Sequence, residues 1–563
     1  MKLHLRKSIF RLLALLPLLC ISLGLSAQSD PSGESPATRT YAITNATIVQ
    51  AAGDTLMNAT IVFKNGLIRS LGTDVSIPGD AEVIDGTDMF VYPGFIDGMS
   101  YTGAVRPDSP ERPDDLFTPD PPNDYAGITP EEQVTSQLSL EENSIEDLRE
   151  IGFTVSHTVP YGRMLPGSGA LLLLNHAEHP DEMLIQDNVS MYTQFVGAPG
   201  AYPGNTLGIM AKFRDLYRNA TYSRQHAEMY ASNPAGMERP TRDRVMEAFY
   251  PVVSNEKPIF YNASSSLEAR RAIRLKNDLG FTLVLGNLEE GWGMIDELKS
   301  SDIKVFMSLE LPDEPENADE DEEVTEEVRE LEERRMEFYT KHVSQFGEME
   351  KAGIKFGFSS IDANSRDIHD NLRTMIANGL SETAALNALT RDAAELLGIS
   401  EITGSLSEGM IANAVVANGP IFDEDTQIRM VFADGDKFDY EIRERRSGGN
   451  GNGDATATSG IEGTWRYTIE SPQGEQGGTM VIEKDGDDYT GTLTSDDGAP
   501  DQEMENLTFV NNSLSFDFSF DGGGQTITIV VVGTVTGTEY DAEASISAFN
   551  VSFPLTAYKE DPQ

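Results

Sequence analysis

The chain has a single cysteine, Cys20, among its 563 residues. Cys20 lies in an N-terminal segment that has the pattern of a secretory signal peptide. Its basic residues end at Arg11, an apolar run covers 12–25, and Leu25-Ser26-Ala27 is typical of a cleavage site. We expect cleavage after Ala27, which leaves a mature chain without cysteine. This excludes disulfides and thiolate metal sites, and the signal peptide (1–27) predicts a periplasmic or secreted location.

Positive charge is also scarce. The 42 lysines and arginines face 92 aspartates and glutamates, a formal net charge of -50. Removal of the signal peptide, which carries four basic residues and no acidic ones, changes this value from -50 to -54. Nucleic acids and anionic membrane surfaces are therefore poor partners. We expect a soluble protein with a hydrated acidic surface once the signal is removed.

Two segments carry a family resemblance. An apolar strand runs into Pro93-Gly94-Phe95-Ile96-Asp97, and far downstream the segment 404–416 has the sequence GSLSEGMIANAVV. The first resembles the opening barrel strand of the amidohydrolase superfamily, the metal-dependent hydrolases of imidazolonepropionase and dihydroorotase type. The second is similar to the closing segment of that family. The resemblance covers roughly residues 41 to 443.

The resemblance implies an α/β fold, a (β/α)8 TIM-type barrel over residues 93–404. A small β-sandwich built from 41–92 and 405–443 accompanies it, after a linker at 28–40. Strand and helix patterns alternate between the two ends, as a parallel barrel requires. Buried strands are predicted at 151–159, 170–174, 257–263, 281–287, 303–310 and 354–360. Lys64-Asn65-Gly66 predicts a tight turn, and helices at 380–399 have Ser381 as a cap and Gly398 as a terminator.

The family's metal ligands are the feature that this chain lacks. The resemblance places two histidines of the first strand at Met99 and Tyr101, further histidines at Asn262 and Gly286, and the aspartate of the eighth strand at Ile361. A thioether and a neutral phenol do not replace imidazole on a borderline divalent metal. We identify no lysine for a bridging carbamate. We therefore predict no metal cofactor and a substrate pocket lined by these five positions.

Asp362 is the remaining candidate for a catalytic group. It directly follows Ile361, and a shift of one residue along a strand turns a side chain to the other face. Asp362 can therefore serve only if the strand ends early. His157 lies in an apolar strand and is expected to be a core residue, whereas His369 is expected to begin a helix. An active site with rearranged ligands would have to recruit His157, Asp362 and His369.

The last hundred residues form a different kind of segment. Residues 444–459 are rich in Gly, Asn and Ser and predict a flexible linker. Residues 460–563 show short strands separated by Gly, Asp and Asn turns, which predicts an all-β domain. Gly463-Thr464-Trp465 at its first strand resembles the opening of a calycin or lipocalin-like barrel. A β-sandwich with a core tryptophan is the alternative.

Three functions remain open at this point. The first is an exported, metal-free amidohydrolase homologue, a pseudoenzyme or one with a non-standard mechanism, that binds a small molecule or serves as partner of an active paralogous amidohydrolase. The second is an active hydrolase of peptide or non-peptide C-N bonds with a rearranged site that holds zinc or another divalent metal. The third is ligand binding by the C-terminal β domain.

Overall fold

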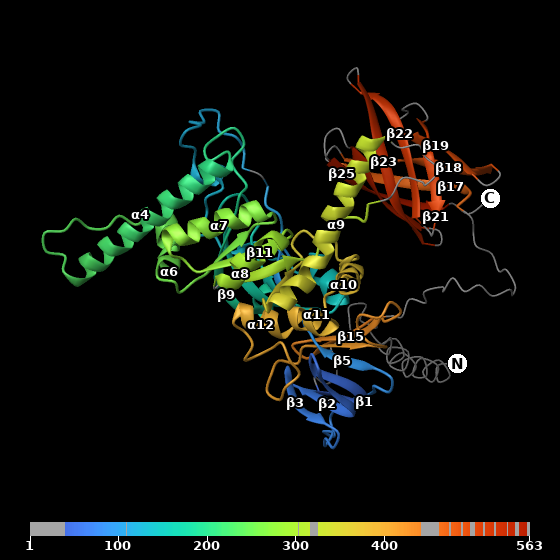
Figure 1. The fold of residues 1–563 in the computed structure, drawn as a ribbon, viewed down its shortest axis with the longest axis horizontal. Helices are drawn as coiled ribbons and strands as arrows, with labels where there is room; N and C mark the ends of the chain where they lie inside the picture. Colours follow the sequence, from blue (N-terminus) through green and yellow to red (C-terminus); the bar gives the residue numbers. More distant parts are fainter. Residues whose placement is uncertain are drawn as a thin grey trace, which may run out of the picture. The chain divides into compact units, whose positions relative to one another are not determined.

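The computed structural model describes residues 40–440, except 109, 302 and 316–324, and residues 461–559, except 472–473, 486–487, 496–501, 511–512, 523–524, 537–538 and 547–550. The predicted signal peptide and the predicted linker at 444–459 lie outside the described residues. The chain divides into two compact units, Met1–Arg445 and Arg446–Gln563 (Figure 1). Within the described ranges, no helix is both long and apolar enough to cross a membrane.

Both ends of the first unit contribute to one mixed sheet. Its strands are β1 (Thr40–Ala51), β2 (Asp54–Lys64), β3 (Leu67–Gly72), β4 (Glu82–Asp85), β5 (Phe90–Pro93), β14 (Ala414–Ala417), β15 (Ile428–Ala433) and β16 (Asp436–Asp439). Strand β14 pairs with β5 and so joins the two ends of the sequence. The ring of Phe432 packs on those of Tyr41 and Phe63, with centroids 5.4 and 4.8 Å away. Asn65 and Gly66 both have positive φ in the predicted turn between β2 and β3.

The barrel consists of eight strands in sequence order. They are β6 (Phe95–Ser100), β7 (Phe153–Thr158), β8 (Gly167–Leu173), β9 (Leu184–Gln194), β10 (Ile259–Asn262), β11 (Leu283–Leu288), β12 (Lys304–Ser308) and β13 (Gly357–Ser359). Hydrogen bonds also link the first and last strands, because Ser359 Oγ donates to Met99 O (2.8 Å) and Ser360 N to Asp97 Oδ1 (3.1 Å). The predicted TIM-type barrel with its composite sheet is therefore confirmed.

One strand departs from the parallel arrangement. Strand β8 pairs antiparallel with both β7 and β9, whereas the other pairs in the barrel are parallel. No α-helix separates β7, β8 and β9; only the short 3-10 helix η2 (Pro180–Met183) lies between β8 and β9. The predicted alternation of strand and helix thus fails at this point, because antiparallel neighbours need no crossover helix.

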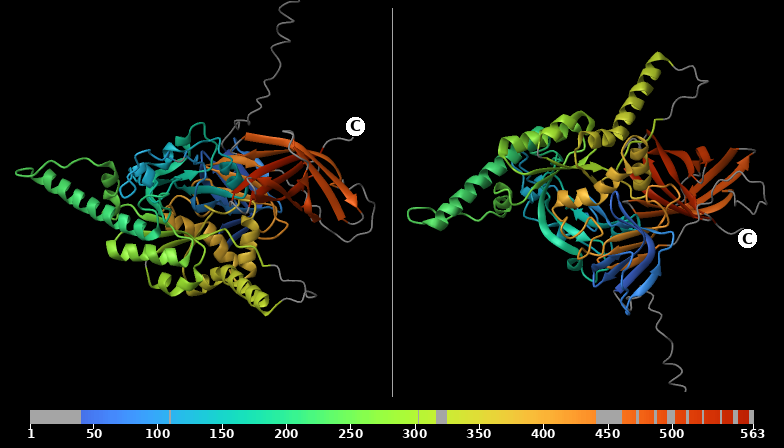
Figure 2. Two further views of the ribbon diagram at one scale, coloured as in Figure 1. Left: turned by 90° about the horizontal axis from the view of Figure 1, so that it is seen from above. Right: turned by 60° about the horizontal axis from the view of Figure 1, so that its bottom comes forward.

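Helices surround the barrel, and α4 projects from it in each view (Figures 1 and 2). Besides α4 (Thr206–Ser232), they are α2 (Asn123–Ala126), α3 (Ser144–Glu150), α5 (Arg244–Ala248), α6 (Tyr250–Val253), α7 (Ser266–Leu279), α8 (Ile295–Ser300), α9 (Glu326–Ala352), α10 (Ile368–Ala377), α11 (Glu382–Leu389) and α12 (Arg391–Leu397), with 3-10 helices η1 (Val134–Ser136) and η3 (Trp292–Met294). Ser381 caps α11 through Ala384 N, and Gly398 ends α12 in a left-handed conformation, as predicted.

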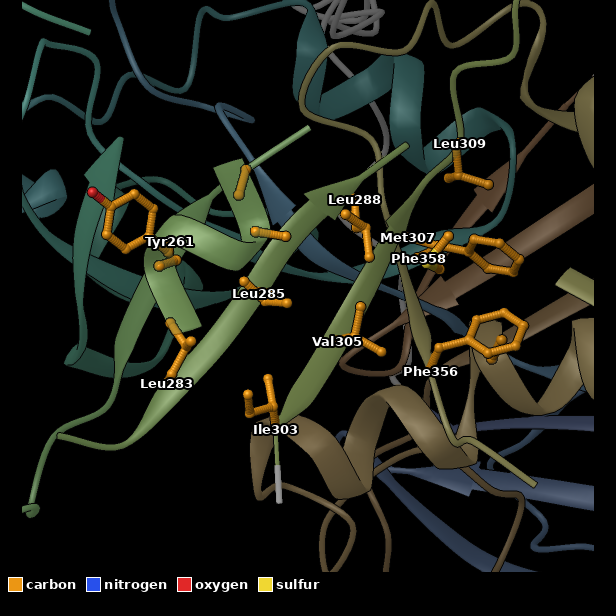
Figure 3. Close-up of a cluster of buried hydrophobic side chains, with 14 of the residues drawn as sticks. Tyr261, Leu283, Leu285, Leu288, Ile303, Val305, Met307, Leu309, Phe356 and Phe358 are labelled. Carbon is orange, nitrogen blue, oxygen red and sulfur yellow. The ribbon is translucent and has the colours of Figure 1, made fainter. Parts of the chain in front are cut away.

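Side chains alternate between the two faces of the barrel wall. Leu283, Leu285 and Val305 point outward into the apolar layer beneath the helices, where Figure 3 shows them with Met307 and Phe358. The residues next to them in sequence, Val284 and Phe306, point inward. They form a separate cluster with Ile96, Val155, Leu171 and Phe260. This period of two fixes which positions of each strand face the barrel interior.

The second unit is an all-β domain, as predicted. Its strands are β17 (Gly463–Ser471), β18 (Gly474–Asp485), β19 (Asp488–Ser495), β20 (Gln502–Glu503), β21 (Glu505–Val510), β22 (Ser513–Gly522), β23 (Gln525–Thr536), β24 (Glu539–Ile546) and β25 (Val551–Lys559). The first strand pairs with the last, and the sheet edges β20 and β21 are separated by Met504 alone. The edges must therefore meet, which curls the sheet into a barrel. Trp465 is buried and donates from Nε1 to Ile461 O (2.9 Å). The resemblance to lipocalins stays a prediction.

Candidate functional site

The five predicted pocket positions lie at the carboxyl ends of the barrel strands. Met99 is the fifth residue of β6, and Tyr101 directly follows that strand. Asn262 ends β10 and is the register partner of Gly286 in β11. Ile361 follows the end of β13. Because these strands are parallel, the five positions gather at one end of the barrel, the end at which barrel enzymes carry their active sites.

Met99 occupies the space next to Gly286. Both residues are buried, and a Cβ atom added to Gly286 would lie 2.6 Å from Met99 Cε and 2.7 Å from Met99 Sδ. Contacts this short require one group to move. A histidine at position 286 therefore requires the end of the Met99 side chain to move. Ile361, also buried, belongs to the same interior cluster.

Tyr101 takes part in a network of neutral polar groups. Its hydroxyl lies 3.1 Å from that of Tyr192, which is buried in β9. Asn262 Nδ2 donates to the Tyr192 hydroxyl (3.4 Å), and that hydroxyl donates to Gln194 Oε1 (3.2 Å). Burial raises the pKa of Tyr101, and it raises the pKa of Tyr192 well above its usual value. Both phenols are therefore neutral near pH 7 and are poor ligands for a cation.

An aromatic wall borders this network. The ring of Tyr101 stacks on that of Tyr161 with centroids 3.9 Å apart and planes 15° apart. The guanidinium of Arg106 lies over Tyr161, with Cζ 4.8 Å from the ring centroid. Arg106 belongs to the long segment between β6 and α2, which follows the carboxyl end of the first barrel strand. The stack offers a flat apolar surface next to hydrogen-bonding groups.

Asp362 lies beyond the end of its strand, because β13 ends at Ser359. The strand therefore ends early, as Asp362 requires in order to act as a catalytic group. Asn287 Nδ2 donates to Asp362 Oδ2 (2.6 Å), and burial raises the pKa of the Asp362 carboxyl. Asp362 nevertheless keeps an exposed surface. The Asp362 carboxyl is therefore partly desolvated by neighbouring protein groups while the residue stays in contact with water.

Glu289 and Glu310 add further negative charge near Asp362. Burial raises the pKa of Glu289 to about 7, with additional repulsion from Asp362, Glu290 and Glu310. Burial raises the pKa of Glu310 as well. We use the term mouth for the surface formed by Tyr101, Tyr192, Asn262, Asn287, Glu289 and Asp362. It combines neutral hydrogen-bonding groups with carboxyls whose pKa burial raises.

The two histidines named above have other roles. His157 is buried inside the barrel, where Nδ1 lies 2.9 Å from Gly98 O and Nε2 lies 2.8 Å from Ser190 Oγ. Burial lowers the pKa of His157 to about 4, so the ring is neutral. His369 Nε2 lies 3.1 Å from Ile151 O. Across the described residues, no three His, Cys, Asp or Glu side chains form a group that could hold a metal, so His157, Asp362 and His369 are not brought together.

The comparisons with known proteins agree with this architecture. Residues 316–438 match the model of the amidohydrolase family. The structure of an amidohydrolase from Thermotoga maritima MSB8 aligns over 71% of this chain and 100% of its own, with 21% identity and a TM-score of 0.59. The first unit has the amidohydrolase fold. The expected resemblance to the amidohydrolase superfamily is confirmed.

More distant structures are also similar. A prolidase complexed with N-methylphosphonate-L-proline aligns over 71% of this chain and 100% of its own, with 14% identity and a TM-score of 0.43. Atrazine chlorohydrolase TrzN from Arthrobacter aurescens TC1, complexed with zinc, aligns over 70% and 94%, with 15% identity and a TM-score of 0.38. No curated protein sequence matches the chain.

The side chains at the mouth do not fit the divalent metal of amidohydrolases. Such a metal needs several imidazole, carboxylate or thiolate donors at one point. The equivalent positions offer the thioether of Met99, the neutral phenol of Tyr101, the amide of Asn262 and no donor at Gly286 or Ile361. The carboxylate of Asp362 is hydrogen-bonded to Asn287. We therefore derive no chemical step through a metal.

Several residues of the mouth and its hydrogen-bond network were not predicted from the sequence. Tyr192 and Gln194 lie on β9, which was not predicted because Gln186, Asp187 and Asn188 interrupt its apolar pattern. Asn287 lies in a predicted strand, but no role was predicted for it, although an amide directly after a ligand position is a usable signal. Its Oδ1 is buried and has no hydrogen-bond partner among the described residues.

Proposed function

We propose that this chain is an exported protein with the amidohydrolase fold that binds a small polar molecule at the mouth and does not carry out metal-dependent hydrolysis there. The observation that supports this best is the contact between Met99 and Gly286, because Met99 fills the space that a histidine at position 286 would need. A site that has lost a ligand and has repacked the space is adapted to the absence of the metal. Export rests on the signal-peptide pattern of residues 1–27.

The polar groups of the mouth support binding. The hydroxyls of Tyr101 and Tyr192 and the amide of Asn262 can donate or accept hydrogen bonds without a change of charge. The buried Oδ1 of Asn287 can accept one more hydrogen bond. The Tyr101 and Tyr161 rings add a flat surface. These features suit a small, uncharged or cationic molecule that carries N-H groups. Service as partner of an active paralogous amidohydrolase is compatible with this role.

The metal content of the mature chain tests the proposal. Purified residues 28–563, dialysed against a buffer with chelator and then against metal-free buffer, should contain far less than one zinc or other transition metal per chain by elemental analysis. About one tightly held metal per chain would overturn the proposal.

A restored site provides a second test. The variant with Met99→His, Tyr101→His, Asn262→His, Gly286→His and Ile361→Asp should fold and take up zinc, because Met99→His removes the thioether that blocks position 286. Gly286→His alone is the matched control and should lose stability without binding zinc. A folded five-residue variant that binds no zinc would mean that the positions are wrongly assigned.

Metal-independent hydrolysis of C-N bonds is the second candidate function. The pKa of Glu289, which burial raises to about 7, favours it, because a carboxyl that titrates near neutral pH can transfer protons. Burial raises the pKa of the neighbouring Asp362 as well. Asp362→Asn would then abolish hydrolysis of a panel of dipeptides and cyclic amides while leaving binding intact. Absence of wild-type turnover across the panel would leave binding as the role.

Ligand binding by the C-terminal domain, the third function considered above, is tested by deletion. A chain lacking residues 447–563 should keep the binding that we propose for the mouth. If binding disappears while the barrel stays folded, the second unit is the site.

A further inference from the structure

A cavity lies at the end of the barrel opposite the mouth. It has a volume of about 270 Å³ and lies at the amino-terminal ends of three neighbouring strands. These strands contribute Pro258 and Phe260 around the start of β10, Thr282 and Val284 around the start of β11, and Lys304 of β12. Leu171, Gln186, Val189, Asn255, Leu396 and Leu397 complete the lining. In parallel barrels this end normally serves stability, so a cavity here is unexpected.

The lining is divided into an apolar floor and a polar rim. Leu171, Phe260, Val284 and Leu396 are buried and belong to the interior cluster of the barrel. The rim residues Gln186, Asn255, Thr282 and Lys304 are exposed. An apolar interior with a few polar groups at its entrance is the usual anatomy of a small-molecule site.

A layer of rings separates this cavity from the mouth. The ring of Phe260 stacks on that of Phe306, with centroids 6.1 Å apart, and lies 4.2 Å from the ring of His157. Phe306 in turn packs so closely on the backbone of Gly98 and Gly357 that neither could carry a Cβ without a clash. A molecule in the cavity would therefore reach neither Met99 nor the mouth residues.

Lys304 supplies the charge at the entrance. Its Nζ donates to Leu396 O at 2.7 Å, and no carboxylate of the described residues lies within ion-pair distance of it. The carboxylate of Glu395 forms its ion pair with Lys355, at 2.5 Å. Lys355 also contributes most to the lowered pKa of Glu395, and the charge of Lys304 contributes less. An ammonium group has three donors, so two remain for a ligand. On a chain with a net charge of -50, such a cation next to an apolar cavity is a local exception.

We propose that this cavity binds a small carboxylate with an apolar tail, the tail on the floor formed by Leu171, Phe260, Val284 and Leu396 and the carboxylate on Lys304. The volume sets the size, because about 270 Å³ corresponds to roughly nine water molecules at ~30 Å³ each. A chain of about eight carbons fits this space. The apolar walls select against short polar acids, and the single cation selects a carboxylate over an alcohol of equal length.

Calorimetric titration of the mature chain with octanoate tests the proposal, with 1-octanol and acetate as comparison ligands. We expect saturable binding of about one octanoate per chain, at least tenfold weaker binding of octanol, and no binding of acetate. Lys304→Met keeps the apolar stem and removes the charge, and should weaken octanoate binding at least tenfold. Lys299→Met, an exposed lysine of α8, is the matched control and should leave it unchanged.

Two further variants locate the binding. Val284→Phe should fill the cavity and abolish binding in a chain whose melting curve shows that it is folded. Tyr101→Phe at the mouth should leave octanoate affinity unchanged. The proposal is overturned if the wild type shows no saturable binding, if octanol binds as well as octanoate, or if Lys304→Met binds like the wild type. Loss of binding through Tyr101→Phe would place the octanoate at the mouth instead.

Discussion

Met99 Sδ and Cε lie only 2.7 and 2.6 Å from the position that a Cβ atom at residue 286 would occupy. The resemblance assigns both positions to metal ligands, and here one holds a long apolar side chain and the other holds glycine. The large side chain on β6 fills the gap that glycine leaves on β11. The interior remains packed although the ligand set is gone.

This packing predicts a coupling between the two residues. Gly286→Ala should lower the free energy of unfolding by about 1–3 kcal/mol through overpacking, and Met99→Ala by about 2–5 kcal/mol through a cavity. In the double variant, alanine at 286 occupies part of that cavity. The double variant should therefore lose less free energy of unfolding than the sum of the two single losses, by at least about 1 kcal/mol in urea denaturation. Gly293→Ala, with no atom nearer than 3.9 Å to the added Cβ, is the control. Additive losses would contradict the contact.

A second prediction concerns the buried carboxyl of Asp97. It accepts hydrogen bonds from Ser360 Oγ (2.6 Å), Ser360 N and Met99 N, yet burial raises its pKa from 3.8 to about 6. Between these values the folded state holds a proton that the unfolded state has released. The contribution of Asp97 to stability therefore falls as pH rises from about 4 to 6, by roughly 3 kcal/mol at most.

Asp97→Asn removes this titration while it keeps an oxygen for the two backbone donors. The stability of the variant relative to the wild type should increase between pH 4 and 6 and stay constant above. Chemical denaturation at half-unit pH steps measures the difference. A difference independent of pH would show that the carboxyl is not desolvated.

His157 should produce the opposite slope. Burial lowers its pKa from 6.5 to about 4, so the unfolded state binds a proton in this range that the folded state does not. The stability contribution of His157 is complete above about pH 6.5 and is lost as pH falls toward 4, again by roughly 3 kcal/mol. His157→Gln should make the chain less sensitive to acid over this interval in the same denaturation series. If His157 were charged in the folded state, the variant would show no such change.

The tryptophans allow the two units to be followed separately. Trp465 is buried in the second unit, and the other tryptophan, Trp292, lies in the first. Trp465→Phe leaves Ile461 O without its donor and creates a void, so the second unit should lose about 2–4 kcal/mol. Circular dichroism should show the earlier unfolding of the β domain, while the fluorescence of Trp292 should follow an unchanged barrel transition. A shift of the Trp292 signal would show that the units unfold together.

The sequence predicts the parts of the fold that depend on local pattern. The Asn65-Gly66 turn, the cap at Ser381 and the terminator at Gly398 are each fixed by the chemistry of one or two residues. The direction of β8 is different, because it depends on which strands it pairs with, and an apolar run has the same pattern in either direction.

The five candidate positions come from the family resemblance and stay a prediction, and the contacts among them come from the structure. Alternation along β10 and β11 places Asn262 and Gly286 inside the barrel. In β6 the pairing register shifts between Asp97 and Ser100, so that Met99 joins the interior cluster together with Ile96, which a strict period of two would not predict. The fit between Met99 and Gly286 does not follow, because it joins strands distant in sequence and depends on side-chain volume. Tyr192 was missed with its strand, since polar residues mask the period of two in β9.

The antiparallel β8 also bears on the order in which the barrel assembles. Strands β7, β8 and β9 are neighbours in sequence and in space, so their pairing closes only short loops, whereas β10 and β11 pair across the crossover helix α7. Local pairings lose less chain entropy and form earlier. Pulse-labelled hydrogen exchange during refolding should therefore protect amides of β7 and β8 before those of β11 and β12. A strand direction that removes two crossovers would then also create a starting point for folding.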